Sequence, residues 1–153
     1  MGLDNGFYVK SNKRKLTRED LPVGIIYPFD KDYEGSPEII YHRKDWGWRN
    51  DIMRTFGWWN DCLNHYKFEL EDPSKVLTLI ELTAGWLDKE RWEDEGQSIW
   101  EYDVARKHLI EDISNLAIIY GWMLNNPDVY LEFYDSYLRG KLCLELYLEL
   151  LFM

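Results

Sequence analysis

One long stretch of the chain, from Gln97 to Asn126, is typical of a single amphipathic helix and constrains the rest of the fold. Ser98 and Glu101 have the spacing of a capping box, in which each side chain bonds the other residue's free backbone amide. Pro127 ends the pattern because it has no amide donor and disfavours helix in the residue before it. Between these limits apolar residues recur at steps of three and four, the period of a helix with one buried face: Ala105, Leu109, Ile113, Leu116, Tyr120 and Met123. The sequence therefore predicts a main helix over 98–125.

Two more helices are predicted upstream. Asp45 can cap a helix over 46–66, where bulky residues recur at helical spacing: Trp48, Ile52, Phe56, Trp59, Leu63 and Tyr66. Asp72 followed by Pro73 is a helix start, because a capping side chain precedes a proline in the first turn. The helix that follows, predicted over 73–91, is apolar over most of its circumference, so we expect it to be central.

The remaining regular segments have the composition of short strands. Aromatic and β-branched residues favour strands over 6–10 and 38–43, which we pair, and a two-residue period favours a strand over 129–135. Residues 23–27 lie between two prolines and leave room for at most an edge strand, while 67–71 are a connection. These elements predict an α+β fold, with three main helices packed on a small, mostly antiparallel sheet.

The chain is long enough for a single domain over 1–153, and its final segment is ambiguous. Leucine alternates with other residues over 142–150 as in a strand, whereas Leu and Glu favour helix, and Glu145 and Glu149 lie four residues apart. We expect 138–153 to be an appended Leu-rich helix. Its apolar surface would allow a homo-oligomer to form through Leu142–Phe152.

The charge of the chain is unevenly distributed. The net charge is −10, yet residues 1–55 hold ten Lys or Arg against nine Asp or Glu, whereas residues 56–153 hold eight against nineteen. An acidic body repels nucleic-acid phosphate over most of its surface, so direct binding of nucleic acid is not expected.

The sequence also predicts the compartment. Cys62 and Cys143 lie far apart without a CxxC spacing, as in a protein of the reducing cytoplasm. The first residues have neither the basic region nor the apolar run of a signal peptide, and no window of eighteen residues is uninterruptedly apolar. We therefore expect a soluble, cytoplasmic protein with no membrane partner.

Recognisable catalytic and cofactor motifs are absent from the sequence. It contains no glycine-rich phosphate loop and no GxSxG nucleophile motif. His42, His65 and His108 are well separated, so no metal site is predicted, and nothing indicates a cofactor or a catalytic residue. These absences favour a binding protein over an enzyme.

Four segments carry a resemblance to a known family: residues 1–6 (MGLDNG), 43–49 (RKDWGWR), 98–102 (SIWEY) and 132–137 (EFYDSY). In this order they resemble a family of small uncharacterised proteins of bacteria and their phages, many of which begin Met-Gly-Leu-Asp. The resemblance extends to about Tyr137 and leaves out 138–153. It implies a phage or prophage setting and supplies no activity and no catalytic residue.

A cluster of basic and aromatic residues is expected where the strand over 38–43 meets the helix over 46–66. The amides at a helix N-terminus are unpaired and attract anions, and arginine adds charge-assisted hydrogen bonds. An anion or nucleotide pocket at this corner would use His42, Arg43, Trp46, Arg49 and Arg54. The alternative is a network of arginine and carboxylate that joins the corner to the acidic helices, with tryptophans packed beneath it.

The acidic helix faces are the other candidate site. Carboxylates are dense along two predicted helices: Glu90, Glu93, Asp94, Glu95, Glu101, Asp103, Glu111 and Asp112. They can be a solvated surface, or they can imitate a phosphate backbone and block a nucleic-acid-binding protein. We expect Glu93, Asp94, Glu95, Glu101 and Asp103, with neighbouring aromatic residues, to bind and modulate a host protein without catalysis.

Overall fold

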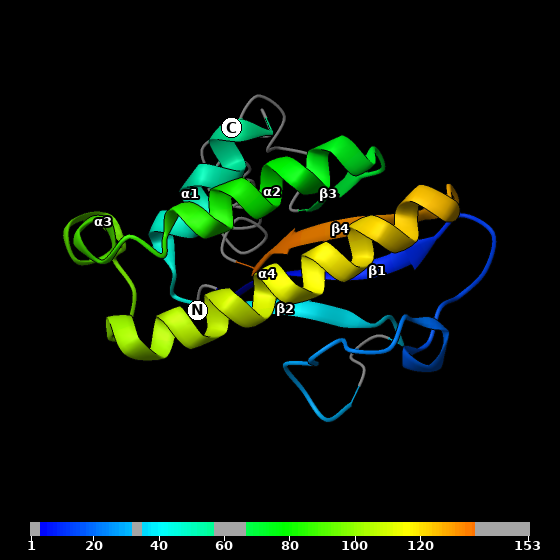
Figure 1. Ribbon diagram of the computed structural model, residues 1–153, viewed down its shortest axis with the longest axis horizontal. Helices are drawn as coiled ribbons and strands as arrows, with labels where there is room; N and C mark the ends of the chain where they lie inside the picture. The colour runs from blue at the N-terminus through cyan, green and yellow to red at the C-terminus, as the bar shows by residue number, and fades with distance from the viewer. Residues whose placement is uncertain (1–3, 32–34, 57–66, 137–153) are drawn as a thin grey trace, which may run out of the picture.

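The centre of the fold is an antiparallel sheet formed by β1 (Asp4–Ser11), β2 (Glu38–Arg43), β3 (Lys67–Leu70) and β4 (Val129–Asp135). The computed structural model describes residues 4–31, 35–56 and 67–136, and the strand order is β2-β1-β4-β3 (Figure 1). The predicted strands over 6–10, 38–43 and 129–135 are confirmed, as is the pairing of the first two. The connection predicted over 67–71 is wrong, because β3 pairs with β4 there, and no strand forms over 23–27.

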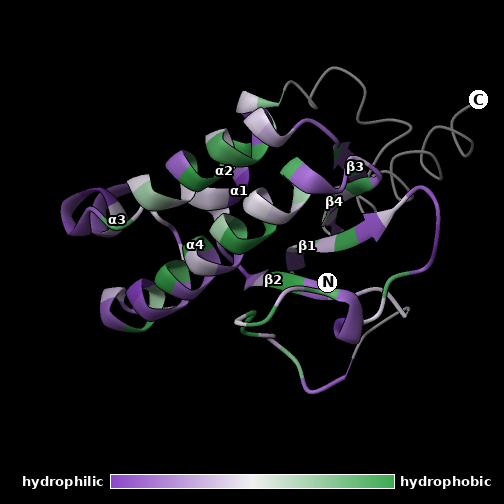
Figure 2. Cartoon of the chain, turned by 45° about the vertical axis from the view of Figure 1, so that its right-hand side comes forward, coloured by the Kyte–Doolittle hydropathy of each residue, from purple (hydrophilic) through white to green (hydrophobic). Residues whose placement is uncertain are grey.

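The helices cover one face of this sheet. They are α1 (Trp46–Thr55), α2 (Pro73–Gly85), α3 (Lys89–Glu95) and α4 (Tyr102–Asn125), with a short 3-10 helix at Arg18–Asp20. α2 and α4 lie side by side across the face, and α3 lies at one end of the molecule (Figures 1 and 2). The predicted α+β fold is confirmed.

Side chains that alternate along the strands form the core between the two layers. Phe7 on β1 lies directly opposite Phe133 on β4, and their rings are 5.1 Å apart between centroids. Trp48 from α1 packs on both rings and is fully buried. Because aromatic side chains bury large areas, this group anchors α1 on the two middle strands.

The opposite face of the sheet is polar and rich in tyrosine. The rings of Tyr8 and Tyr134 are 5.1 Å apart, and the Tyr134 hydroxyl donates a hydrogen bond to Glu38. Lys10 forms an ion pair of 3.1 Å with Glu132. Sheets of this kind alternate apolar side chains toward the helices with polar side chains on the other face.

α4 begins later than the sequence predicts. The predicted capping box does not form: the Ser98 hydroxyl accepts a hydrogen bond from the amide of Trp100, and Glu101 precedes the first turn without a side-chain bond to it. The buried stripe also differs, because Asp112 and Asn115 are buried whereas Ile113 and Tyr120 are only half-buried. Polar residues therefore occupy part of the face that packs on the sheet.

The helices predicted over 46–66 and 73–91 begin as predicted, but their ends differ from the prediction or lie outside the described residues. Asp45 and Asp72 cap α1 and α2 as predicted, through bonds to the amides of Trp48 and Ser74. The helix predicted over 73–91 is interrupted after Gly85, and a second helix, α3, starts behind its own cap. The part of the 46–66 prediction beyond Phe56, and the tail at 138–153 with its interface at Leu142–Phe152, lie outside the described residues.

Asn115 fixes the loop before β2 to the core. Its side-chain amide donates to the carbonyls of Ile26 and Ile39, at 2.7 and 2.8 Å, and its oxygen accepts from the amide of Ile26 at 2.8 Å. A buried asparagine with all these bonds made is stable, since its polar atoms keep partners inside the protein. The loop is thereby held beside α4.

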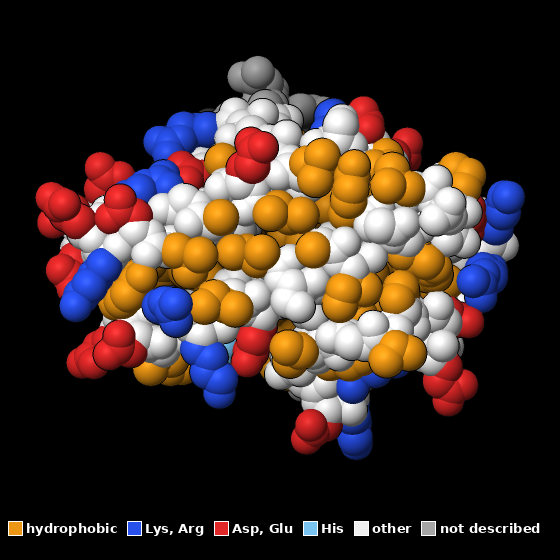
Figure 3. All heavy atoms as spheres, in the orientation of Figure 1, with side chains coloured by type: hydrophobic (Ala, Val, Ile, Leu, Met, Phe, Trp, Pro, Cys, Tyr) orange, Lys and Arg blue, Asp and Glu red, His pale blue; other side chains and the backbone are white. Residues whose placement is uncertain are grey.

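The outer face of α2 and α4 is largely apolar. Hydrophobic side chains gather across the middle of this face, and charged side chains surround them (Figure 3). Leu77, Ile110 and Leu124 are among the exposed apolar residues, and the space beside Gly121 on α4 is open to about 4 Å from where a Cβ atom would lie. Among the described helices, none is both long and apolar enough to cross a bilayer.

Gly47 on α1 and Gly121 on α4 allow a matched test of how closely the helices are packed. Gly47→Ala should lower the free energy of unfolding by about 1–3 kcal/mol, because the new methyl group would lie 2.6 Å from the Trp86 indole. Gly121→Ala should raise it by about 0.5–1 kcal/mol, because that site is open and alanine favours helix. Urea unfolding measures both. Equal effects of the two substitutions would contradict the close packing of Gly47 on α1 against Trp86.

Candidate functional site

The corner between β2 and α1 contains a charged side chain that is almost fully buried. His42, the last but one residue of β2, lies between two carboxylates: Nδ1 is 2.9 Å from Asp45, and Nε2 is 2.6 Å from Asp112 on α4. The Trp48 indole stacks on the imidazole, with ring centroids 3.9 Å apart and planes within 7°. The histidine therefore joins β2, α1 and α4.

The environment of His42 keeps it protonated. Burial alone would lower its pKa, but the charge of Asp112 and hydrogen bonds with Asp112 and Asp45 outweigh burial and raise the pKa to about 10. Burial raises the pKa of Asp112, and the positive charge of His42 opposes that rise. At neutral pH both ring nitrogens donate hydrogen bonds.

A protonated His42 has a restricted chemistry. It has no free lone pair, so it cannot act as a general base or ligate a metal in this state. Elsewhere in the described ranges, no three side chains of His, Cys, Asp or Glu gather closely enough to hold a metal ion. The geometry makes His42 a buried cation that holds three elements together.

Two of the three arginines predicted to bind an anion at this corner, Arg49 and Arg54, are paired with carboxylates. Arg49 is buried and its Nε lies 2.6 Å from Asp135, while Arg54 is exposed and lies 2.7 Å from Asp51. The Arg49 guanidinium also lies over the ring of Trp46 at 5.3 Å. Of the five predicted residues, His42 and Arg43 line one hollow at the end of β2, and Trp46 packs with Arg49 on α1. Arg54 is exposed at the other end of α1.

The first amides of α1 also have partners within the chain. Gly47 donates to the carbonyl of Gly96 at 2.9 Å, Trp46 to that of Gln97 at 3.5 Å, and Trp48 to the Asp45 carboxylate. The donors that an anion would use at this helix N-terminus are therefore already engaged. An anion pocket at the corner stays a prediction, and this geometry does not favour it.

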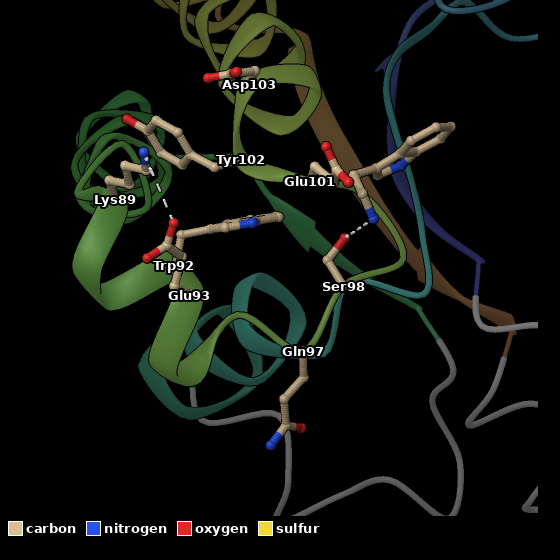
Figure 4. Close-up of a pocket in the computed structure, with 9 residues that line it drawn as sticks. Lys89, Trp92, Glu93, Gln97, Ser98, Glu101, Tyr102 and Asp103 are labelled. Atoms are coloured by element: carbon tan, nitrogen blue, oxygen red, sulfur yellow. Dashed lines mark hydrogen bonds and ion pairs between the residues drawn. The ribbon is translucent and has the colours of Figure 1, made fainter.

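Two hollows lie beside this corner, and Trp92 and Trp100 line both of them. The first, which we call the acidic hollow, has a volume of about 470 Å³ and lies between α3 and the start of α4 (Figure 4). Besides the two tryptophans, its lining residues are Lys89, Glu93, Gln97, Ser98, Glu101, Tyr102 and Asp103. The lining thus contains three carboxylates, three aromatic rings and one lysine.

That lysine shows how a cation is accommodated in the acidic hollow. Lys89 Nζ lies 4.0 Å from the Glu93 carboxylate and 5.9 Å from the centre of the Tyr102 ring. Tyr102 is itself fixed by a hydrogen bond from its hydroxyl to the carbonyl of Leu87. Carboxylates and aromatic faces both attract positive charge, so the surface suits a basic side chain.

The predicted acidic partner surface is divided between this hollow and the exposed side of α3. Glu93, Glu101 and Asp103 line the acidic hollow. Asp94 and Glu95 are exposed on α3, and Glu95 lies 3.7 Å from Arg91. The structure therefore brings three of the five predicted residues to one concave surface.

The second hollow, which we call the histidine hollow, also has a volume of about 470 Å³. It lies between the end of β2, the first turns of α4 and the loop that Asn115 holds. His42, Asp45 and Asp112 line it, together with the exposed Arg43. Most of its remaining lining is aromatic or apolar: Ile26, Tyr27, Pro28, Phe29, Ile39, Tyr41, Trp92, Trp100, Ala105, His108, Leu109 and Glu111.

The role of Asp112 is not predicted from the sequence. The pattern of charges groups Asp112 with the solvated carboxylates of α4, whereas the residue is only 7% exposed and bonds His42. The one available signal is its position, since Asp112 follows Ala105 and Leu109 by seven and three residues and so falls on the buried stripe. Nothing in the sequence alone indicates that His42 lies opposite.

No protein-family model, curated protein or solved structure matches the chain. The resemblance to proteins of bacteria and phages therefore stays a prediction.

The protonated histidine has a consequence for stability at alkaline pH. The pKa of His42 is raised above its value in the unfolded chain, so its contribution is complete below pH 6.5 and is lost as pH rises toward 10. The native chain should have a larger free energy of unfolding than His42→Gln at pH 6. This difference should decrease over the range, by at most about 1.4 kcal/mol per pH unit. Urea unfolding at pH 6, 8 and 9.5 measures it. His108→Gln, at a half-exposed site, is the control, and a constant difference for His42→Gln would contradict a buried cation.

Proposed function

We propose that this chain is a non-enzymatic binding module that docks a basic segment of a partner protein on the acidic hollow. The observation that carries the proposal is the lining of this hollow, in which Glu93, Glu101 and Asp103 lie with Trp92, Trp100 and Tyr102 around one surface. Arginine and lysine side chains combine a positive charge with an apolar stem, and both parts find a complement there.

The exposure of Trp100 supports a protein partner. Trp100 is 44% exposed, and its neighbour Ile99 is 52% exposed. Exposed tryptophan at a concave surface is typical of the anchor positions of protein interfaces, where aromatic residues are enriched. The surrounding carboxylates would speed the approach of a basic partner and select against an acidic one.

The setting of this interaction follows from the sequence alone. The resemblance to phage and prophage proteins would make the partner a host protein, and the separated cysteines would place the encounter in the cytoplasm.

A peptide of alternating glycine and arginine tests the proposal with a matched ligand control, in which citrulline replaces arginine and removes only the charge. We expect the arginine peptide to shift the indole signals of Trp92 and Trp100 in an NMR titration and the citrulline peptide to leave them unchanged. Neutralising Glu93, Glu101 and Asp103 together, as Gln, Gln and Asn, should weaken binding about tenfold.

A second triple variant provides the protein control. Glu19, Glu71 and Glu81 are exposed and do not line the acidic hollow, so their replacement by glutamine removes the same charge elsewhere. This variant should retain nearly all of the affinity for the arginine peptide. If both triple variants weaken binding equally, the net charge of the chain explains the attraction and the proposed docking surface is wrong.

A further inference from the structure

The histidine hollow is lined by a carboxylate oxygen that has no partner among the described residues. Asp112 lies at the floor of this hollow and uses one carboxylate oxygen, Oδ2, to accept the hydrogen bond from His42. The other oxygen, Oδ1, accepts no hydrogen bond from any described residue, although the side chain is nine-tenths buried. Oδ1 is not one of the described buried atoms that lack a partner, so it is open to the hollow and can accept a hydrogen bond from a ligand that enters.

The polar side-chain atoms of Asp45 and His42 are all hydrogen-bonded to described residues. Asp45 accepts from His42 with one oxygen and from the amide of Trp48 with the other. His42 donates through both nitrogens. Among the carboxylate oxygens of Asp45 and Asp112, Asp112 Oδ1 is therefore the one that no described residue bonds, and it is the acceptor that we assign to an incoming donor.

The walls of the histidine hollow are suited to a flat ring. Phe29 and Tyr41 pack edge to face on one side, with centroids 4.7 Å apart. Trp100 and His108 form a second pair, with centroids 5.8 Å apart. Both pairs line the same hollow, together with aliphatic residues, so an aromatic ligand would gain contact area against ring faces and edges.

The charges around the histidine hollow restrict the class of ligand that it can bind. Asp45 and Asp112 share one positive charge at the floor, that of His42, which leaves an excess of one negative charge there. Arg43 and Glu111 have opposite charges and lie among the other lining residues. The floor therefore favours a hydrogen-bond donor or a cation over an acceptor or an anion.

We propose that the histidine hollow binds a planar nitrogen heterocycle whose N–H group donates a hydrogen bond to Asp112 Oδ1, the chemical class to which nucleobases belong. The aromatic walls hold the ring, and the free carboxylate oxygen selects the edge that carries the donor. This site shares Trp92 and Trp100 with the docking surface on the acidic hollow, but Asp112, Phe29 and Tyr41 do not line that surface.

Two probes of similar size and shape test the requirement for a donor. 2-Aminobenzimidazole presents N–H groups on one edge, whereas 2-methylbenzoxazole presents none. In NMR titrations of the full chain, we expect the first probe to shift the signals of residues that line the histidine hollow and to bind at least tenfold more tightly than the second. Equal binding of the two probes, or no binding of the first, would overturn the proposal.

Asp112→Asn tests most directly whether the Asp112 carboxylate determines the preference between the two probes. The asparagine oxygen would face His42, so its NH₂ group would face the hollow, and an acceptor would become a donor. The preference between the two probes should then disappear or reverse. Asp103→Asn makes the same chemical change on the same helix outside the histidine hollow and should leave the preference unchanged.

A second variant keeps the test valid if Asp112→Asn does not fold. Ala105 lines the histidine hollow from α4 and is only 3% exposed, so Ala105→Leu fills space there while leaving the Asp112 carboxylate in place. We expect it to abolish the shifts caused by 2-aminobenzimidazole and to leave binding of the arginine peptide in place. Unchanged probe binding by Ala105→Leu would show that the ligand lies elsewhere and would overturn the proposal.

Discussion

The position of one buried positive charge determines how the layers of this protein meet. His42 belongs to the sheet, Asp45 caps α1, and Asp112 belongs to α4, so two hydrogen bonds of a single imidazole join three elements. Buried charges are costly unless they are paired, and each member of this group supplies the partner that the others need. Trp48 covers the remaining face of the ring and separates it from the apolar core. Loss of any one of His42, Asp45 and Asp112 would leave a buried charge of this group without one of its partners.

The two hollows beside this charge differ in the kind of recognition they allow. The carboxylates of the acidic hollow are exposed, so water screens them, and they act mainly on the approach and orientation of a partner. Asp112 in the histidine hollow is buried, where a single hydrogen bond discriminates more strongly between ligands. Trp92 and Trp100 line both hollows, so the two hollows share part of their walls.

The sequence predicts the elements of this fold better than it predicts their polar contacts. The apolar periods and the caps at Asp45 and Asp72 identify the strands and helix starts, because these are local properties of the chain. β3 is not predicted because a four-residue edge strand has too little pattern to recognise. Asp112, the second partner of His42, lies 70 residues away from it, and Asp135 lies 86 residues away from Arg49. No local spacing shows which acid among many will be buried with these side chains.

The place of β1 in the sheet also determines when this domain can form during synthesis. β1 pairs on one side with β2 and on the other with β4, and Asp4 exchanges two hydrogen bonds with Ser136 across 132 residues. Until the ribosome has released β4, one edge of β1 has no strand to pair with, and exposed edges attract other chains. A nascent chain of this protein therefore keeps one edge of its central strand unpaired until its last described strand emerges.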